Sequence, residues 1–370
     1  MPSDWRADAL AGLTLPTFRA GAVRGVTAAG PDRQGGMLRS LFRSCLLLSV
    51  FSLRAGGVEI ARGTVHRNTM WAPTLGAMKH MMVYLPPSYD TTRTATKRYP
   101  VAIYLHGRWG DETDIVKLGR LAASMDSLIA GGMPEMIVAM PDGDDGWWTT
   151  WNSASDMAEC ARTPHRDEPA AEFCVPNPNY DYYVAHDVTQ FVDSTYRTLA
   201  RRESRAIGGY SMGGYGSFTI AARYPEVFGV AVSHGGVLTP GLMADSTTLS
   251  ATGQVTWRIG RSNAELRKAS GPNEWGAMFQ MFGVDPTSWH ARDPASLFLA
   301  VKARGAPMPV LYADAGIGDE RLQQNETFRA TLEANHIPLS YAEWKGKHTW
   351  KYVQAHLPEG LHFIADRMTR

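Results

Sequence analysis

Apolar and polar positions follow a regular order along the chain from residue 58 onward. Buried strands are predicted by short apolar runs at 99–107, 136–143, 204–210, 228–236, 308–316 and 338–346. Helices are predicted by apolar positions at helical spacing in 114–132, 182–199, 212–225, 293–304, 320–335 and 349–369. Two earlier strands, 58–67 and 78–87, are expected to pair antiparallel. The segment 237–292 has no clear period, and we expect it to form an excursion over the sheet.

Strands that alternate with helices in this way indicate an α/β fold. Consecutive strands joined through helices run parallel, and the helices cover both faces of a mostly parallel central sheet. In such sheets the functional groups gather at the carboxyl ends of the strands. The residues that directly follow each predicted strand are therefore the candidates for chemistry.

The first 57 residues differ from the rest, and we expect a leader, 1–57, ahead of one α/β domain, 58–370. Within the leader, 37–57 starts with a second methionine, continues with two arginines and a nine-residue apolar run, 45–53, and ends in small residues. Such a run is too short to span a bilayer but suits the core of a signal peptide. We expect translation to start at Met37 and the protein to be secreted or periplasmic. The alternative is a buried N-terminal helix of a cytoplasmic protein.

Composition narrows the class of partner. The 370 residues are 44% hydrophobic and 20% charged, enough to bury a core, and 37 Lys and Arg against 36 Asp and Glu give a net charge of +1. This balance gives no electrostatic reason to expect nucleic acid or an acidic membrane as partner. Neither CxxC nor HExxH occurs, so the sequence predicts no metal site. It makes no prediction about oligomeric state.

The three cysteines are relevant to whether the protein is exported from the cytoplasm. Cys45 lies within the expected signal, which leaves Cys160 and Cys174 as a pair in a polar segment. In an exported protein we expect these two to form a disulfide that closes a short loop, worth about 3 kcal/mol from the entropy of loop closure. Spacing alone leaves two unrelated thiols as the alternative.

The glycine-rich stretch GGYSMGGYG carries the strongest indication of chemistry. Gly209 to Gly213 form a GxSxG sequence between a predicted strand and a predicted helix, which is the context of a nucleophile elbow. In such a turn the serine, here Ser211, is exposed on a strained backbone, and the glycines leave room that side chains would block. The alternative is an ordinary glycine-rich turn between a strand and a helix.

A serine hydroxyl needs a base, and in this context the chain order is Ser, then Asp or Glu, then His. His348 lies in the loop between the last predicted strand and the last helix, which makes it the predicted base. The acid should follow the preceding strand. Asp319 stands after a Gly-Ile-Gly bend that could bring it to His348, and Asp314, at the strand end, is the second candidate.

Two backbone N–H groups should bind the oxyanion of the reaction. One is expected from Met212, directly after the serine. The other should come from the loop after an early strand, LHGRWGD (105–111), where we predict the N–H of Arg108. His106 precedes the serine in the sequence and is expected to hold this loop by hydrogen bonding.

These motifs together resemble one known group of enzymes. The chain is similar over 75–369 to the putative-esterase (esterase D-like) branch of the α/β-hydrolases. The resemblance is carried, in this order, by VYLPPSYD, YPVAIYLHG, VAMPDG, YYVAHDVTQFVDSTYRT, GGYSMGGYGSF, ARYPEVFG, YADAGIGDE and GKHTW. It implies the triad Ser211, Asp319 and His348. Two departures bear on the substrate: 155–179 looks inserted, and 237–292 is longer than a minimal member needs.

The resemblance implies a serine hydrolase that cleaves carboxylic esters through an acyl-enzyme, with no metal or cofactor. That group includes S-formylglutathione hydrolases, feruloyl and acetyl-xylan esterases and mycolyltransferases. The alternatives are therefore an acyltransferase, an S-formylglutathione-type thioester hydrolase, and a binding module that keeps the fold. We expect a small-molecule or carbohydrate-linked ester as substrate. Tryptophans in GWWTTW (146–151) and at Trp257, Trp275 and Trp289 could form an aromatic rim for a feruloyl or sugar-linked ester, or could simply pack in the core.

Overall fold

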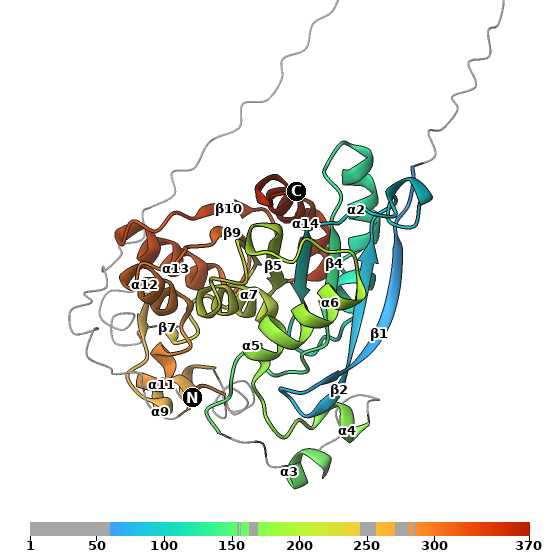
Figure 1. The fold of residues 1–370 in the computed structure, drawn as a ribbon. Coiled ribbons are helices and arrows are strands. Elements are labelled where there is room, and N and C mark those ends of the chain that lie inside the picture. Colours follow the sequence, from blue (N-terminus) through green and yellow to red (C-terminus); the bar gives the residue numbers. More distant parts are fainter. Residues whose placement is uncertain are drawn as a thin grey trace, which may run out of the picture. The chain divides into compact units, whose positions relative to one another are not determined.

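A sheet of eight strands runs through the described part of the chain (Figure 1). The computed structural model describes residues 60–370 except 154, 156, 163–168, 245–256, 271–280 and 284–285. The predicted leader, 1–57, therefore lies outside the described residues. In spatial order the strands are β1 (Thr64–Ala72), β2 (Ala77–Leu85), β4 (Ile137–Pro141), β3 (Val101–Leu105), β5 (Arg205–Tyr210), β6 (Val230–His234), β9 (Val310–Gly316) and β10 (Ser340–Trp344).

The direction of the strands confirms the predicted α/β fold. β1 and β2 form an antiparallel pair, and β2 also runs antiparallel to β4. From β4 to β10 every neighbouring pair is parallel. The carboxyl ends of β3, β5, β6, β9 and β10 therefore meet at one edge of the sheet, so the loops that follow them can share one site.

Helices cover both faces of the sheet, and each face has its own apolar core (Figure 1). One face carries α7 (Met212–Arg223), which packs on β5 and β6 and against α12 (Pro294–Ala303). Phe218, Phe298 and Phe328 meet there with ring centroids 5.5 to 6.3 Å apart, the last from α13 (Leu322–Ala334). The other face carries α2 (Leu121–Ala130) against α14 (Trp350–Arg367).

Two predicted helices differ from the observed ones. The predicted helix at 114–132 is divided into α1 (Asp114–Lys117) and α2, because Arg120 adopts a left-handed backbone with φ 57°. The predicted helix at 182–199 starts earlier, as α5 (Tyr180–Tyr182), and continues through η2 (Tyr183–Val188) and α6 (Thr189–Thr195). It ends early because Thr198 forms a bridge with Tyr99 beside the sheet.

The two segments that depart from the resemblance hold short elements. The excursion after β6 contains β7 (Leu242–Ala244) and β8 (Trp257–Ile259), which pair apart from the main sheet, and α9 (Asn263–Ser270) and α11 (Pro286–His290). The segment before α5 contains α3 (Met157–Arg162) and α4 (Ala170–Phe173). A disulfide joins Cys160 in α3 to Cys174, whose Cα atoms lie 5.7 Å apart.

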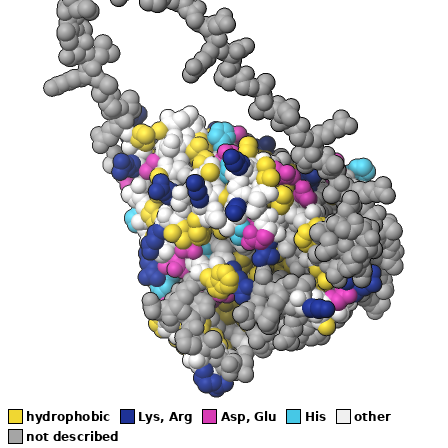
Figure 2. Space-filling view, turned by 180° about the vertical axis from the view of Figure 1, so that it is seen from behind, with side chains coloured by type: hydrophobic (Ala, Val, Ile, Leu, Met, Phe, Trp, Pro, Cys, Tyr) yellow, Lys and Arg dark blue, Asp and Glu magenta, His cyan; other side chains and the backbone are white. Residues whose placement is uncertain are grey.

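The surface in Figure 2 mixes the two signs of charge. On the described part of that face, Lys and Arg side chains lie among Asp, Glu and isolated apolar side chains. Among the described residues, we find no helix with the length and apolar character needed to cross a bilayer.

Candidate active site

Ser211 stands on a strained turn between β5 and α7. Its φ of 57° and ψ of −114° lie outside the ordinary regions for a residue with a side chain. The turn closes because its flanking glycines carry no Cβ: one on Gly209 would lie 2.4 Å from the backbone of Gly213, and one on Gly213 only 2.1 Å from the carbonyl oxygen of Leu105. The Ser211 N–H donates to the carbonyl of His234 at 3.0 Å, which fixes the turn to β6.

The structure brings Ser211, His348 and Asp319 together from three separate loops. His348 Nε2 lies 2.8 Å from Ser211 Oγ, and His348 Nδ1 lies 2.8 Å from Asp319 Oδ2. The carboxylate accepts only, so Nδ1 carries a proton and Nε2 is free to accept the hydroxyl proton of Ser211. The Asp319 side chain is fully buried while that of His348 is 16% exposed, so the pair meets solvent through the imidazole.

Backbone contacts hold the Asp319 carboxylate in place. Its second oxygen, Oδ1, accepts from the N–H of Arg321 at 2.7 Å, and its own N–H donates to the carbonyl of Gly316 at 2.9 Å. Gly235, with φ 51°, passes beside the pair: a Cβ there would lie 3.1 Å from Asp319 Oδ2 and 3.4 Å from His348 Nδ1. This close approach of the backbone needs glycine.

An aromatic pair supports the imidazole, and sequence reasoning missed it. The ring of Tyr210 stacks on His348 with centroids 4.9 Å apart and planes at 29°, and Trp350 packs against Tyr210 at 5.1 Å. Burial raises the pKa of the Tyr210 phenol above its ordinary value, so the ring stays neutral beside the imidazole. The signal available was position, since Tyr210 precedes the serine and Trp350 follows His348 by two residues.

The two predicted oxyanion donors come from different elements. Met212 is the first residue of α7, so its N–H has no acceptor within the helix. Arg108 follows Gly107, whose carbonyl oxygen accepts from His106 Nδ1 at 2.8 Å and from the Gly110 N–H at 3.1 Å. Because a peptide unit is planar, holding the Gly107 oxygen also fixes the direction of the Arg108 N–H. The predicted role of His106 in holding this loop is thus confirmed.

The second candidate acid, Asp314, pairs with a different histidine. Its Oδ2 lies 2.7 Å from Nδ1 of His234, and its Oδ1 accepts from the hydroxyl of Tyr352 at 2.7 Å. Asp314 and His234 face each other in the register of β6 and β9, and both side chains are fully buried. The structure therefore leaves Asp319, not Asp314, as the carboxylate on His348.

The tryptophan-rich stretch packs in or against the core, which is the second of the two alternatives that the sequence left open. Trp148 is fully buried and Trp147 2% exposed, because the Trp148 ring packs against Gly216 and its Nε1–H donates to the carbonyl of His106 at 3.1 Å. Trp289 is also buried, and Trp257 is 44% exposed. Trp275 lies outside the described residues.

An exposed tryptophan that the sequence reasoning did not single out lies within the predicted oxyanion loop, 105–111. Trp109 is 72% exposed and has a left-handed backbone with φ 60°, held by a 2.6 Å bond from its N–H to Asp145. The guanidinium of Arg108 lies 4.7 Å from its ring. A bulky residue held in this strained conformation suggests a role in binding.

The site also contains a group of side chains that could in principle bind a metal ion. Among the described His, Cys, Asp and Glu side chains, one group brings three ligand atoms within 4.8 Å of one another: Asp319, Glu320 and His348. Asp319 and His348 are hydrogen-bonded to each other, and His348 is also hydrogen-bonded to Ser211. These hydrogen bonds already engage two of the three side chains.

Comparison with known proteins identifies relatives of the chain. A family model described as "Putative esterase" matches residues 72–364. The chain is 29% identical over 174 residues to an endo-1,4-beta-xylanase/feruloyl esterase of Xylanibacter ruminicola. The aligned segment is 46% of this chain and 21% of that protein. It is 29% identical over 158 residues to Esterase Rv1288 of Mycobacterium tuberculosis, 42% of this chain and 28% of that one. The chain thus spans about a quarter of the length of these curated relatives.

A solved structure supports the same fold. It is described as FphF, a fluorophosphonate-binding serine hydrolase of Staphylococcus aureus, substrate bound. The two chains align with a TM-score of 0.59 at 19% identity, over 82% of this chain and 99% of that one. Because the family model matches residues 72–364, most of the chain, the chain belongs to the family described as "Putative esterase".

Proposed function

We propose that this protein is a carboxylic ester hydrolase that acts through an acyl-enzyme on Ser211. The observation that carries the proposal is the hydrogen-bonded series Ser211 Oγ, His348 and Asp319, with both distances 2.8 Å, on a strained elbow. A serine alone is a weak nucleophile, and a base held by a carboxylate makes it a strong one. Membership of the "Putative esterase" family supports the same reaction class.

In the proposed mechanism, His348 Nε2 takes the proton of Ser211 as its oxygen attacks the ester carbonyl. The Asp319 carboxylate stabilises the imidazolium that forms. The N–H groups of Met212 and Arg108 bind the oxyanion of the tetrahedral intermediate. The intermediate collapses to an acyl-serine, and the alcohol leaves with the proton from His348. Water then attacks the acyl group by the same sequence of steps and restores Ser211.

Replacement of the serine tests this proposal. Ser211→Ala removes the nucleophile and leaves the buried glycine turn intact, so kcat with 4-nitrophenyl acetate should fall at least about 10⁴-fold while the melting temperature stays unchanged. A fluorophosphonate probe should label the native protein and leave the variant unlabelled. A folded Ser211→Ala protein with native activity would refute the assignment.

For the substrate, we propose acyl or feruloyl esters linked to carbohydrate. One of the similar proteins is named a feruloyl esterase. The exposed Trp109, with the Arg108 guanidinium against its ring, offers a flat surface for a sugar or aromatic ring. Trp109→Ala should raise KM for a feruloyl arabinose ester about tenfold and leave KM for 4-nitrophenyl acetate unchanged. A sugar ester found as product when a free sugar is added would instead favour acyl transfer.

We also propose that the protein works outside the cytoplasm. The Cys160–Cys174 disulfide supports this, because disulfides persist in oxidising compartments. Expression of the full chain in a bacterial host with a Sec pathway should yield a periplasmic protein that starts after the 37–57 segment. Protein recovered from the cytoplasm with that segment still attached would contradict the proposal.

A further inference from the structure

Lys79 lies on the core face of β2, where an apolar residue is expected. The strand turns Ala77, Lys79, Met81 and Val83 inward, and Met78 stays 39% exposed. The Lys79 side chain is fully buried. Burying an unpaired ammonium costs several kcal/mol, so this position is stable only if acceptors surround the group.

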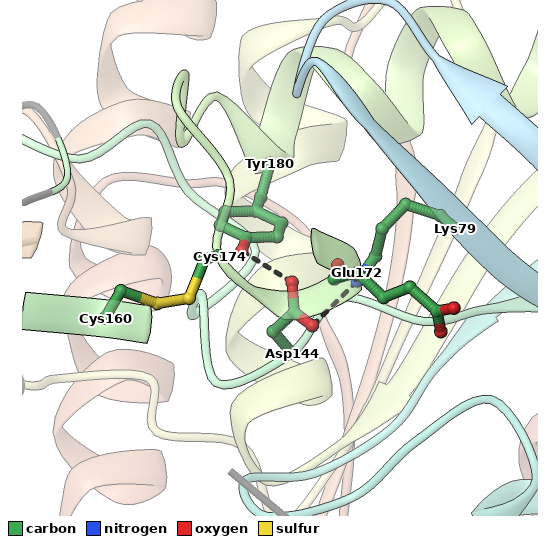
Figure 3. The surroundings of a disulfide bond; sticks show 6 residues. All are labelled: Lys79, Asp144, Cys160, Glu172, Cys174 and Tyr180. Carbon is green, nitrogen blue, oxygen red and sulfur yellow. Dashed lines mark hydrogen bonds and ion pairs between the residues drawn. A yellow bond between two sulfur atoms is a disulfide. The ribbon is translucent and has the colours of Figure 1, made fainter. Parts of the chain in front are cut away.

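Three acceptors use all three protons of the Lys79 ammonium. Its Nζ lies 2.7 Å from Asp142 Oδ2, 2.7 Å from Asp144 Oδ1 and 3.1 Å from the carbonyl oxygen of Glu172. Figure 3 shows the ammonium beside Asp144 and Glu172, with the Tyr180 hydroxyl donating to the other oxygen of Asp144 at 2.7 Å. Burial acts to lower the pKa of Lys79, but the two carboxylates raise it above its ordinary value, so the group is charged.

A short series of contacts leads from Lys79 to the loop that carries Arg108. Asp142 directly follows β4, and its Oδ1 lies 3.5 Å from His106 Nε2. The same nitrogen accepts from the N–H of Gly143, the next residue, at 3.1 Å. The other ring nitrogen, Nδ1, donates to the Gly107 oxygen, which fixes the Arg108 N–H as described above. Lys79 thus holds the 142–143 backbone that orients His106.

On its other side Lys79 contacts the disulfide-bonded segment. Glu172 lies in α4, a helix of four residues, and its carboxylate also lies 3.1 Å from His80 Nε2. A helix this short is unstable by itself. The disulfide between Cys174, two residues further on, and Cys160 restrains the segment next to Lys79 (Figure 3). The insertion that departs from the resemblance therefore covers the buried ammonium.

We propose that Lys79 is a positioning residue for the oxyanion loop and that the Cys160–Cys174 disulfide keeps it in place. Through Asp142, Gly143 and His106, Lys79 fixes the direction of the Arg108 N–H. The disulfide keeps the Glu172 carbonyl on the ammonium and water away from it. This inference rests on the proposed function, which assigns the Arg108 N–H to the oxyanion.

Substitution of Lys79 tests the inference in the full-length protein. Lys79→Met keeps the length of the side chain and removes its charge, so kcat for 4-nitrophenyl acetate should fall at least about tenfold with KM nearly unchanged. Affinity for an aryl trifluoromethyl ketone, which forms a tetrahedral oxyanion on the serine, should fall by the same factor. Lys79→Arg should recover part of both losses. The matched control is Lys97→Met. Lys97 is half-exposed and forms an ion pair with Glu135, so its loss should change neither kcat nor the affinity for the ketone.

A second variant tests the disulfide and covers the case in which Lys79→Met fails to fold. The double variant Cys160→Ser, Cys174→Ser should lower kcat and ketone affinity about threefold to fivefold. All values are taken per active site titrated with a fluorophosphonate, which removes the effect of unfolded protein.

The outcomes separate this inference from the proposed function. The inference is supported if, within each variant, kcat and the affinity for the ketone fall by the same factor. This applies to the double variant and to the Lys79 variants that fold. Native kcat per titrated site in these variants, with only the melting temperature lowered, overturns it. The proposed function fails independently, if Ser211→Ala keeps its activity or its fluorophosphonate labelling.

Discussion

Two histidine–aspartate pairs lie at the carboxyl edge of the sheet, and they differ in what the second ring nitrogen contacts. The Nδ1–Oδ2 distance is 2.8 Å in His348–Asp319 and 2.7 Å in His234–Asp314. His348 places Nε2 on the hydroxyl of Ser211 at 2.8 Å. His234 Nε2 is buried and has no hydrogen-bond partner among the described residues. The pair alone therefore does not define a catalytic base, because the group on the other nitrogen decides its chemistry.

The His234–Asp314 pair, which we call the inner pair, instead supports the backbone beneath the His348–Asp319 pair, the outer pair. The His234 carbonyl accepts from the N–H of Ser211, and the carbonyl of Asp314 accepts from the N–H of Gly235 at 2.7 Å. Gly235 in turn lies against the Asp319 carboxylate and the His348 ring. The His348–Asp319 pair can move a proton, whereas the His234–Asp314 pair stabilises the backbone at Ser211 and Gly235 that contacts it.

Replacing each histidine by glutamine should separate these roles with the largest effect. His348→Gln removes the base, so kcat for 4-nitrophenyl acetate should fall at least about 10⁴-fold with little change in melting temperature. His234→Gln disturbs a buried side chain that is hydrogen-bonded to Asp314, so the free energy of unfolding should fall by about 1 to 3 kcal/mol. Its kcat per titrated active site should stay within about tenfold of native. Equal losses of kcat per site in the two variants would show that the comparison is wrong.

Position in the sequence selects Ser211, His348 and Asp319, which the structure joins by hydrogen bonds. Each follows a strand, and the strand-turn-helix context identifies the elbow without any knowledge of strand order. The choice between Asp319 and Asp314 rests on position alone in the sequence. It depends physically on which residue of β9 faces His234 in β6, and this register is a tertiary property.

Burial is the feature that the sequence predicts least well here. The sequence left a rim and the core open for Trp147 and Trp148, and both pack in the core. Trp109, which the sequence reasoning did not single out, is exposed. Lys79 occupies a core position of β2 and Met78 an exposed one, the reverse of their hydropathy. The partners that make Lys79 stable, Asp142 and Asp144, are more than 60 residues away in the chain, so no local pattern indicates them.

Replacing Asp319 or Asp314 by asparagine should separate the two pairs by a smaller factor in kcat than replacing the histidines. Asp319→Asn keeps the size of the side chain but removes the charge that fixes the His348 tautomer, so kcat should fall about 10³- to 10⁴-fold. Asp314→Asn leaves the triad charges intact and should reduce stability by about 3 kcal/mol. Chemical denaturation and active-site titration measure the two effects separately. A catalytic loss in Asp314→Asn as large as that in Asp319→Asn would mean that the buried carboxylate acts in the reaction.

Two glycines next to the pairs offer a finer comparison. A Cβ on Gly235 would press on the Asp319 carboxylate at a left-handed backbone, and a Cβ on Gly360 would lie 2.5 Å from His234 Nε2. Gly235→Ala should therefore lower kcat about tenfold and stability by about 1 to 2 kcal/mol. Gly360→Ala should lower stability by about 1 to 3 kcal/mol and leave kcat per site unchanged. Reversed effects would place the catalytic pair at His234.

The dependence of activity on pH gives the smallest and most selective difference. An imidazolium cannot accept the Ser211 proton, so the profile of kcat/KM against pH should have an acid limb. Tyr352→Phe removes the donor to Asp314 Oδ1 and leaves a buried carboxylate oxygen without that bond, which should cost about 1 to 3 kcal/mol of stability. Because Tyr352 contacts the inner pair, the acid limb of the kcat/KM profile should keep its midpoint in this variant. A shifted midpoint, measured on protein that circular dichroism shows to be folded across the pH range, would mean that the inner pair tunes the base as well as holding the backbone beneath it.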